Sequence, residues 1–208
     1  MMEVTVSLVR TEALRGMDLG MVETAMPQRA ARARRFRFEN DRLLCLGAGF
    51  LMMRALGIRA ESEVCLGENG KPYAPGFPPF SISHSGSVCI LASVPSGAVG
   101  ADIEAVDPKH LDIASSVYTP AELGWMAQDP MERFFRLWTW KESVMKATGL
   151  GLALEPRRLE VLPFAGGGAV HACGRDWYAR GGSLDGYVFS VCADAPLAPP
   201  RWTEYRPE

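Results

Sequence analysis

The segment FSISHSGSVCILASVPSGAVGADIE, residues 80–104, holds three short runs with the character of β-strands. Two of them, Phe80–Ser83 and Val88–Val94, are separated by a Ser-Gly turn at 85–86. The third, Val99–Glu104, follows a Pro-Ser-Gly break. The segment therefore predicts three consecutive strands.

Helical patterns flank these strands on both sides. An apolar helix is expected over about Asp41 to Leu56, with Gly57 ending it, and a longer one over about Met131 to Thr148. Thr-Pro-Ala-Glu at 119–122 is typical of a helix start, with a Thr cap and Pro at the first helical position. The remaining expected strands lie at about 3–9, 159–162, 169–173 and 187–192. The chain therefore predicts an α+β fold.

The amino-acid composition argues against several classes of protein. The 208 residues are 48% hydrophobic and 22% charged, which is ordinary for a globular protein and excludes a disordered chain. No apolar run approaches the roughly 20 residues that span a bilayer, so we expect no membrane association. The net charge of −2 argues against a general nucleic-acid binder, although arginines gather at residues 29–37.

The N-terminus and the cysteines indicate a cytoplasmic location. MMEVTVSLVR alternates apolar and polar residues as a strand does, and shows no secretory signal. The five cysteines are an odd number without a C-x-x-C pair, which disfavours a zinc site or a disulfide framework. A reducing cytoplasm is the simplest expectation.

The first candidate site residues are Asp102 and Glu104 on the third strand. Side chains alternate along a strand, so the two carboxylates share one face, about 7 Å apart, while Ile103 points the other way. Oxygen ligands in this arrangement suit a hard cation such as Mg²⁺. A solvent-facing acidic pair on an edge strand is the alternative.

The second candidates lie on the expected helix around WTWKESVMK, residues 138–146. With Phe134 at 0°, Lys141 falls at about 340° and Glu142 at about 80°, both inside the apolar arc, and Lys146 lies on its margin. Buried charges are costly unless they are paired or bind something. A Glu142–Lys146 pair on a solvated face is the alternative.

The third group comprises Lys71, in Gly-Lys-Pro at 70–72, and His84, in Ser-His-Ser at 83–85. A fixed lysine and a histidine at a strand end suit an anion. A loop lysine and a hydrogen-bonded structural histidine are the alternatives. For the arginines at 29–37 a solvated helix face and an anion site are the two interpretations, and both can hold for different arginines.

Together, these motifs make the chain resemble the Sfp-type phosphopantetheinyl transferases. That family carries G-K-P, an S-H-S-like step, a G-[VI]-D-[IVL]-E strand and, about 40 residues later, a [FW]-[ST]-x-K-E-[SA]-x-x-K helix. All four are present in this order, with 40 positions between Asp102 and Glu142, and the segment 27–36 resembles the family's basic helix. Ala101 and Ser81 depart from the usual Val or Ile and the frequent Asn.

The resemblance implies two similar α/β halves that form a pseudo-dimer in one chain, with the site between them. We expect an N-terminal half, 1–98, with the basic helix and the coenzyme A-binding loop. The C-terminal half, 99–208, would hold the carboxylates and the K-E-x-x-x-K helix. A pseudo-dimer has no need to dimerise, so a monomer is expected.

The activity that the resemblance implies is transfer of the 4′-phosphopantetheine arm of coenzyme A to a serine of an apo acyl or peptidyl carrier protein. The reaction needs Mg²⁺ and releases adenosine 3′,5′-bisphosphate. The implied metal ligands are Asp102, Glu104 and Glu142, with Glu142 also accepting the serine proton, directly or through water. Lys146 would neutralise the leaving phosphate. The implied coenzyme A contacts are Arg32, Lys71, Ser83, His84 and Lys146.

Two other functions use the same residues. A Mg²⁺-dependent hydrolase would use water as the nucleophile and would release free phosphopantetheine without a carrier protein. A non-catalytic module would bind coenzyme A or carrier proteins, but binding alone needs no set of metal-centred carboxylates. The sequence does not identify the carrier protein.

Overall fold

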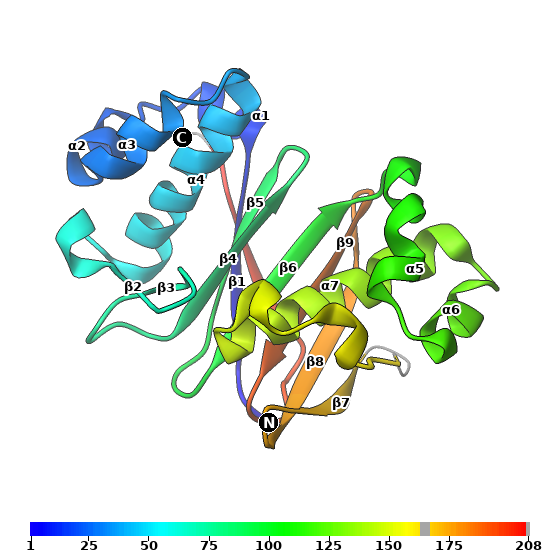
Figure 1. The fold of residues 1–208 in the computed structure, drawn as a ribbon. Coiled ribbons are helices and arrows are strands. Elements are labelled where there is room, and N and C mark those ends of the chain that lie inside the picture. Colours follow the sequence, from blue (N-terminus) through cyan, green and yellow to red (C-terminus); the bar gives the residue numbers. More distant parts are fainter. Residues whose placement is uncertain (163–166, 207–208) are drawn as a thin grey trace.

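The computed structural model describes residues 1–162 and 167–206 of the chain (Figure 1). None of the helices in the described part is long and apolar enough to cross a membrane. The α-helices are α1 (Thr11–Arg15), α2 (Gly20–Ala25), α3 (Pro27–Ala33), α4 (Glu39–Leu56), α5 (Ala114–Val117), α6 (Pro120–Met126) and α7 (Pro130–Thr148). The strands are β1 (Thr5–Arg10), β2 (Cys65–Leu66), β3 (Pro72–Tyr73), β4 (Phe80–Ser85), β5 (Val88–Ser93), β6 (Val99–Ala105), β7 (Gly167–Ala172), β8 (Arg175–Leu184), β9 (Tyr187–Ala193) and β10 (Arg201–Tyr205).

Two four-stranded sheets, each covered by one long helix, form the architecture. The first sheet has the order β10-β1-β5-β4 and packs against α4. The second has the order β6-β9-β8-β7 and packs against α7. The expected α+β fold with two sheet-containing halves is thus confirmed. The chain passes from one sheet to the other between β5 and β6, while β10 returns to pair in parallel with β1.

The sheets meet along their edge strands, β4 and β6, which lie side by side in the middle of the molecule (Figure 1). Beneath this seam, apolar side chains of both sheets share one core, in which Val6, Ile90, Ile103 and Val191 are fully buried. The burial of this shared face, at roughly 25 cal/mol per Å² of apolar surface, holds the halves together.

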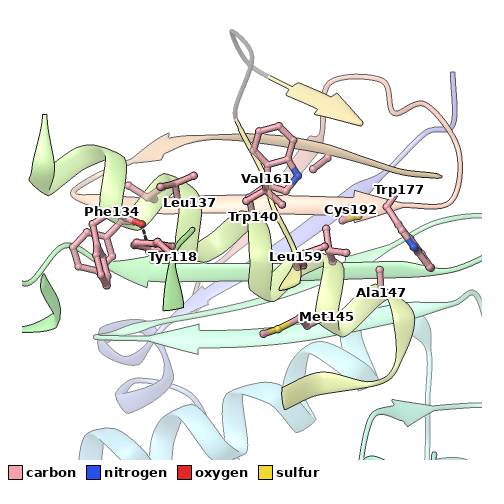
Figure 2. Close-up of a cluster of buried hydrophobic side chains, with 14 of the residues drawn as sticks. Tyr118, Phe134, Leu137, Trp140, Met145, Ala147, Leu159, Val161, Trp177 and Cys192 are labelled. Atoms are coloured by element: carbon pink, nitrogen blue, oxygen red, sulfur yellow. Dashed lines mark hydrogen bonds between the residues drawn. The ribbon is translucent and has the colours of Figure 1, made fainter. Parts of the chain in front are cut away.

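Helix α7 forms the core of the second half (Figure 2). Leu137, Trp140 and Met145 pack in one cluster with Leu159 and Val161. The helix begins after Asp129, whose side chain accepts from the Glu132 N–H, and ends at Gly149 with φ +75°. Both ends follow the expected helix closely, because the caps and the apolar stripe are local signals.

Lys141, which was expected inside the apolar arc of the helix, forms an ion pair with another residue of the protein. Its ammonium is fully buried and lies 2.8 Å from the Glu122 carboxylate. It also donates to the carbonyls of Pro156 and Leu159. Glu122 in turn accepts from the Thr119 N–H and the Val161 N–H. The pair is fully hydrogen-bonded, which offsets the cost of burying both charges.

The C-terminal tail departs most from expectation. The strand expected at 159–162 is wrong, because the Val161 N–H and the Leu159 carbonyl bond to the Glu122–Lys141 pair instead of a neighbouring strand. The strands at 169–173 and 187–192 correspond to β7 and β9. The sequence analysis missed β8 and β10; the latter is an exposed strand with one intermediate position and no apolar alternation.

Gly100 lets α7 lie directly on β6. A Cβ at Gly100 would lie 1.9 Å from the Ser143 carbonyl oxygen and 2.4 Å from the Ala147 nitrogen, so any side chain here must push α7 away. We expect Gly100→Ala to lower the free energy of unfolding by at least about 3 kcal/mol, the upper range for overpacking.

Gly124→Ala is the matched control, because nothing lies within 4 Å of its Cβ position in helix α6. It should raise stability by up to about 1 kcal/mol, the helix propensity difference. Thermal and urea denaturation of both variants provide the measurement. Equal stability of the two variants would contradict the close approach of α7 to β6.

Candidate active site

Strand β6 presents Asp102 and Glu104 to one side and buries Ile103 on the other, as the alternation predicts. The side with the carboxylates faces α7 and β4, since Asp102 bonds to Lys146 and Ser83 while Glu104 bonds to Trp138 and Ser85. The acidic pair is therefore not a solvent-facing pair on an open edge.

Asp102 is 2% exposed and its two oxygens have different surroundings. Its Oδ1 accepts from Lys146 Nζ at 2.6 Å and from Ser83 Oγ at 2.7 Å. Its Oδ2 is buried and has no hydrogen-bond partner among the described residues. A buried carboxylate oxygen without a partner is costly, and it is the kind of atom that a bound cation would satisfy.

Three serines on β4 face β6 across the seam. Ser81 Oγ accepts from the Ala101 N–H at 3.0 Å, Ser83 Oγ from the Ile103 N–H at 3.4 Å, and Ser85 Oγ from the Ala105 N–H at 3.1 Å. We call these three residues the serine ladder. Ser81, which differs from the frequent Asn of the family, thus still orders the backbone of β6.

Glu104 is held from both halves of the molecule. Ser85 Oγ donates to its Oε2 at 2.7 Å, and Trp138 Nε1 donates to its Oε1 at 3.3 Å. Burial and the neighbouring Asp102 carboxylate raise the pKa of Glu104. These causes outweigh the two hydrogen bonds and Lys146, which lower it.

Glu142 and Lys146 extend the site along α7. Burial raises the pKa of Glu142 to about 7; Lys146 opposes this rise, and Asp102 and Glu104 add to it. Burial alone would lower the pKa of Lys146, but Asp102, Glu142 and Glu104 raise it overall, so its ammonium stays charged. One lysine thus faces three carboxylates, and the site has an excess of negative charge.

These residues fit a hard divalent cation. Asp102 raises the pKa of Glu104 and Glu142, and its own Oδ2 atom has no partner among the described residues, so added positive charge would relieve both costs. As the side chains stand, no group of three acidic, histidine or cysteine residues in the described part of the chain is arranged to hold a metal ion. Side-chain rotation would therefore accompany binding.

A groove of about 550 Å³ is connected to the carboxylates through Ser85, which lines it and donates to Glu104. Arg32 and His84 line it, together with Asn40 of α4 and Gly86 of the β4–β5 turn. Asn40 donates to the Gly86 carbonyl at 2.7 Å, which fixes the turn against the helix. Burial, Lys146 and Arg32 lower the pKa of His84, so the imidazole is neutral near physiological pH.

Lys71 does not line the groove that Arg32 and His84 line, and Ser83 accepts a hydrogen bond from Lys146 Nζ at 3.0 Å. Lys71 Nζ donates to the Val99 carbonyl at 2.8 Å, and burial lowers its pKa to about 8. Lys71 and Lys146 line a second cavity of about 210 Å³, which shares Gly70, Pro72 and Ile82 with the groove. The structure thus brings Arg32 and His84 together at one end, and Lys71 and Lys146 together at the other.

The arginines at residues 29–37 do not all have the same surroundings. Arg29 lies in α3, where its guanidinium donates to the Cys45 carbonyl at 3.2 Å, and its backbone N–H donates to Glu61. Arg34, Arg35 and Arg37 are exposed, and none of the three forms an ion pair with a described residue. The segment is neither one solvated face nor one anion site.

Comparison of the sequence with known protein families gives one match. The family model described as the 4′-phosphopantetheinyl transferase superfamily matches residues 98–192, which contain Asp102, Glu104, Glu142 and Lys146. Over these residues, which make up slightly less than half of the chain, the chain is similar to this superfamily. The resemblance drawn from the motifs is thereby confirmed.

Curated relatives with similar sequences carry the same name. The chain is 34% identical to a "4′-phosphopantetheinyl transferase" of Bacillus subtilis over 64% of this chain and 64% of the relative. It is 33% identical to "4′-phosphopantetheinyl transferase Sfp" of B. subtilis strain 168, over 62% of each. A "Phosphopantetheinyl transferase" of Thraustochytrium is 32% identical over 61% of this chain and 53% of the relative. The chain spans less than two thirds of the length of each.

The contacts of Ser85 and Trp138 with Glu104 were missed by the sequence analysis. A signal for the serines was present, because Ser81, Ser83 and Ser85 alternate on one strand and must share a face. Nothing in the sequence indicates that this face meets another strand edge. Trp138 was recognised only as a residue of the family's helix motif, and the motif does not indicate that its indole N–H contacts Glu104.

The raised pKa of Glu142 makes a prediction for the metal-free protein. Its pKa lies at about 7 in the folded state, above the ordinary value of 4.5. Ionised Glu142 therefore destabilises the fold as pH rises through this window. We expect Glu142→Gln in EDTA to raise the melting temperature by an amount that grows from about pH 4.5 to about pH 8.

Glu23→Gln, at an exposed position of α2, is the control and should show no such pH dependence. Differential scanning calorimetry of both variants beside the wild type gives the comparison. A fall in melting temperature for Glu142→Gln at the higher pH would instead indicate a stabilising Glu142–Lys146 pair.

Proposed function

We propose that this protein transfers the 4′-phosphopantetheine arm of coenzyme A to a serine of an apo acyl or peptidyl carrier protein, releasing adenosine 3′,5′-bisphosphate. The observation that carries this proposal is the meeting of Asp102, Glu104, Glu142 and Lys146 beside a groove lined by Arg32 and His84, in a chain similar to this superfamily. In this proposal, residues 1–98 supply the nucleotide contacts, and 99–208 supply the carboxylates.

Asp102, Glu104 and Glu142 would hold Mg²⁺, which when bound stabilises negative charge on the pyrophosphate of coenzyme A. The unpartnered Asp102 Oδ2 and the mutual repulsion of the carboxylates support this assignment. Carboxylate oxygens without nitrogen or sulfur ligands are the set that Mg²⁺ prefers.

Glu142 is proposed as the group that accepts the proton of the attacking serine, directly or through water. In the metal-free protein its pKa is about 7, and a bound cation would lower this pKa, so that Glu142 would be ionised and able to accept a proton at physiological pH. Lys146 would neutralise the leaving phosphate, and its raised pKa keeps it charged. Positioning and charge stabilisation of this kind account for most catalysis of phosphoryl transfer.

For the nucleotide, Arg32 and His84 are proposed to bind the 3′-phosphate in the groove they line. Lys71 and Ser83 would contact the nucleotide from the side of Lys146; in support, Lys71 and Lys146 line one cavity and Lys146 donates to Ser83. The site offers side-chain cations in place of a glycine-rich phosphate loop.

For the carrier protein, the exposed Arg34, Arg35 and Arg37 offer positive charge next to the groove. Phe38, which follows them, is 63% exposed and adds apolar surface. An acidic carrier would be attracted to this segment, chiefly through faster association. This proposal does not distinguish fatty acid, polyketide and nonribosomal peptide carriers.

The direct test is intact-mass analysis of candidate apo carriers incubated with the protein, coenzyme A and Mg²⁺. We expect a gain of one phosphopantetheine arm per carrier, its abolition by EDTA and its restoration by added Mg²⁺. Transfer that persists after exhaustive chelation would contradict the metal assignment. Free phosphopantetheine formed without any carrier would show a hydrolase instead.

The nucleotide assignment predicts that dephospho-coenzyme A is a poorer substrate than coenzyme A. His84→Ala should reduce this discrimination several-fold, because the partner of the 3′-phosphate is then missing in both cases. His171→Ala is the matched control, since His171 is an exposed histidine on β7. The ratio of kcat/KM for the two substrates is the measurement, and an unchanged ratio in His84→Ala would place the 3′-phosphate elsewhere.

A further inference from the structure

The hydroxyl of Ser85 serves two partners at once. It donates its single proton to Glu104 Oε2 at 2.7 Å and accepts from the Ala105 N–H at 3.1 Å. A serine hydroxyl has one donor and two acceptor sites, so its donor is fully used by the carboxylate. An alanine at this position would leave Glu104 Oε2 without that partner.

The serine ladder repeats this arrangement with a fixed offset. Each serine accepts from the N–H of the residue 20 positions later, and Ser83 and Ser85 also donate to the side chain 19 positions later, on Asp102 and Glu104 respectively. For Ser81 the corresponding residue is Gly100, which has no side chain. Ser81 therefore joins the strands as Ser85 does, without touching a carboxylate.

Glu104 needs such a contact more than an exposed glutamate does. It lies in a partly buried site where burial and Asp102 disfavour its charge, and no lysine or arginine forms an ion pair with it in the described part of the chain. Ser85 and Trp138 are its hydrogen-bond donors, one on each oxygen. Partners of this kind orient metal-binding carboxylates and typically contribute about 10- to 100-fold to metal affinity.

We propose that Ser85 is a positioning residue of the carboxylate site, whose hydroxyl holds Glu104 toward the divalent cation that Asp102 and Glu142 share. This rests on the proposed function only in requiring a cation at these carboxylates. It requires neither coenzyme A nor a carrier protein.

The test is titration of the protein with Mn²⁺ alone, followed by electron paramagnetic resonance of free and bound metal. We expect Ser85→Ala to weaken Mn²⁺ binding by about 10-fold or more. Ser81→Ala should bind like the wild type, although it loses the equivalent backbone hydrogen bond. Ser85→Thr keeps the hydroxyl and should bind within about twofold of the wild type. Thermal denaturation establishes that each variant is folded.

The outcomes separate positioning from a merely structural role. Equal weakening in Ser81→Ala and Ser85→Ala, or wild-type binding by Ser85→Ala, would overturn the proposal. Binding by Ser85→Thr as poor as that of Ser85→Ala would do the same. So would wild-type protein that retains no more Mn²⁺ than Asp102→Asn.

The two proposals can fail separately. A wild-type protein that binds Mn²⁺ in a Ser85-dependent manner but modifies no carrier would contradict the transferase assignment alone. Transfer that is observed together with Ser85-independent Mn²⁺ binding would contradict the positioning role alone.

Discussion

The contact between the edge strands β4 and β6 is the constraint on which the rest of the molecule depends. Edge strands present unpaired N–H groups, which other chains can exploit for pairing. Here serine hydroxyls of β4 accept from three N–H groups of β6, and a shared apolar core lies beneath them. The contact between β4 and β6 brings side chains of both halves next to one another. The candidate site therefore forms only when the two halves are packed together.

The charged side chains along the contact between the two sheets determine what the candidate site can bind. Asp102 raises the pKa of both Glu104 and Glu142, Glu104 adds to the rise at Glu142, and the nearby ammonium of Lys146 opposes both shifts. Such a site is costly in the metal-free protein, and a divalent cation would relieve that cost. The other lysine of the helix motif, Lys141, is paired instead with Glu122 of helix α6, 2.8 Å away. Helix α7 thus contributes Lys141 to a buried ion pair within the fold, and Glu142 and Lys146 to the candidate site.

Local signals predicted most of the elements, and long-range pairings account for what they missed. The caps and apolar stripe of α7 and the alternation of β6 were readable, so the shared face of Asp102 and Glu104 could be foreseen. The partner of Lys141 could not, because Glu122 belongs to another helix and meets it only after packing. Strand β10 has little apolar alternation and pairs with β1 across nearly the whole chain. The serine ladder was visible as a pattern but not as a contact, since its partner strand belongs to the other sheet.

The central claim is that the seam between the two sheets forms a divalent-cation site beside a nucleotide groove. A crystal structure of the protein with coenzyme A and Mn²⁺, with anomalous differences collected at the manganese edge, tests it most directly. The account predicts one anomalous peak bounded by Asp102, Glu104 and Glu142, with the nucleotide's 3′-phosphate beside Arg32 and His84. A peak remote from these carboxylates, or coenzyme A bound outside the groove, would contradict it.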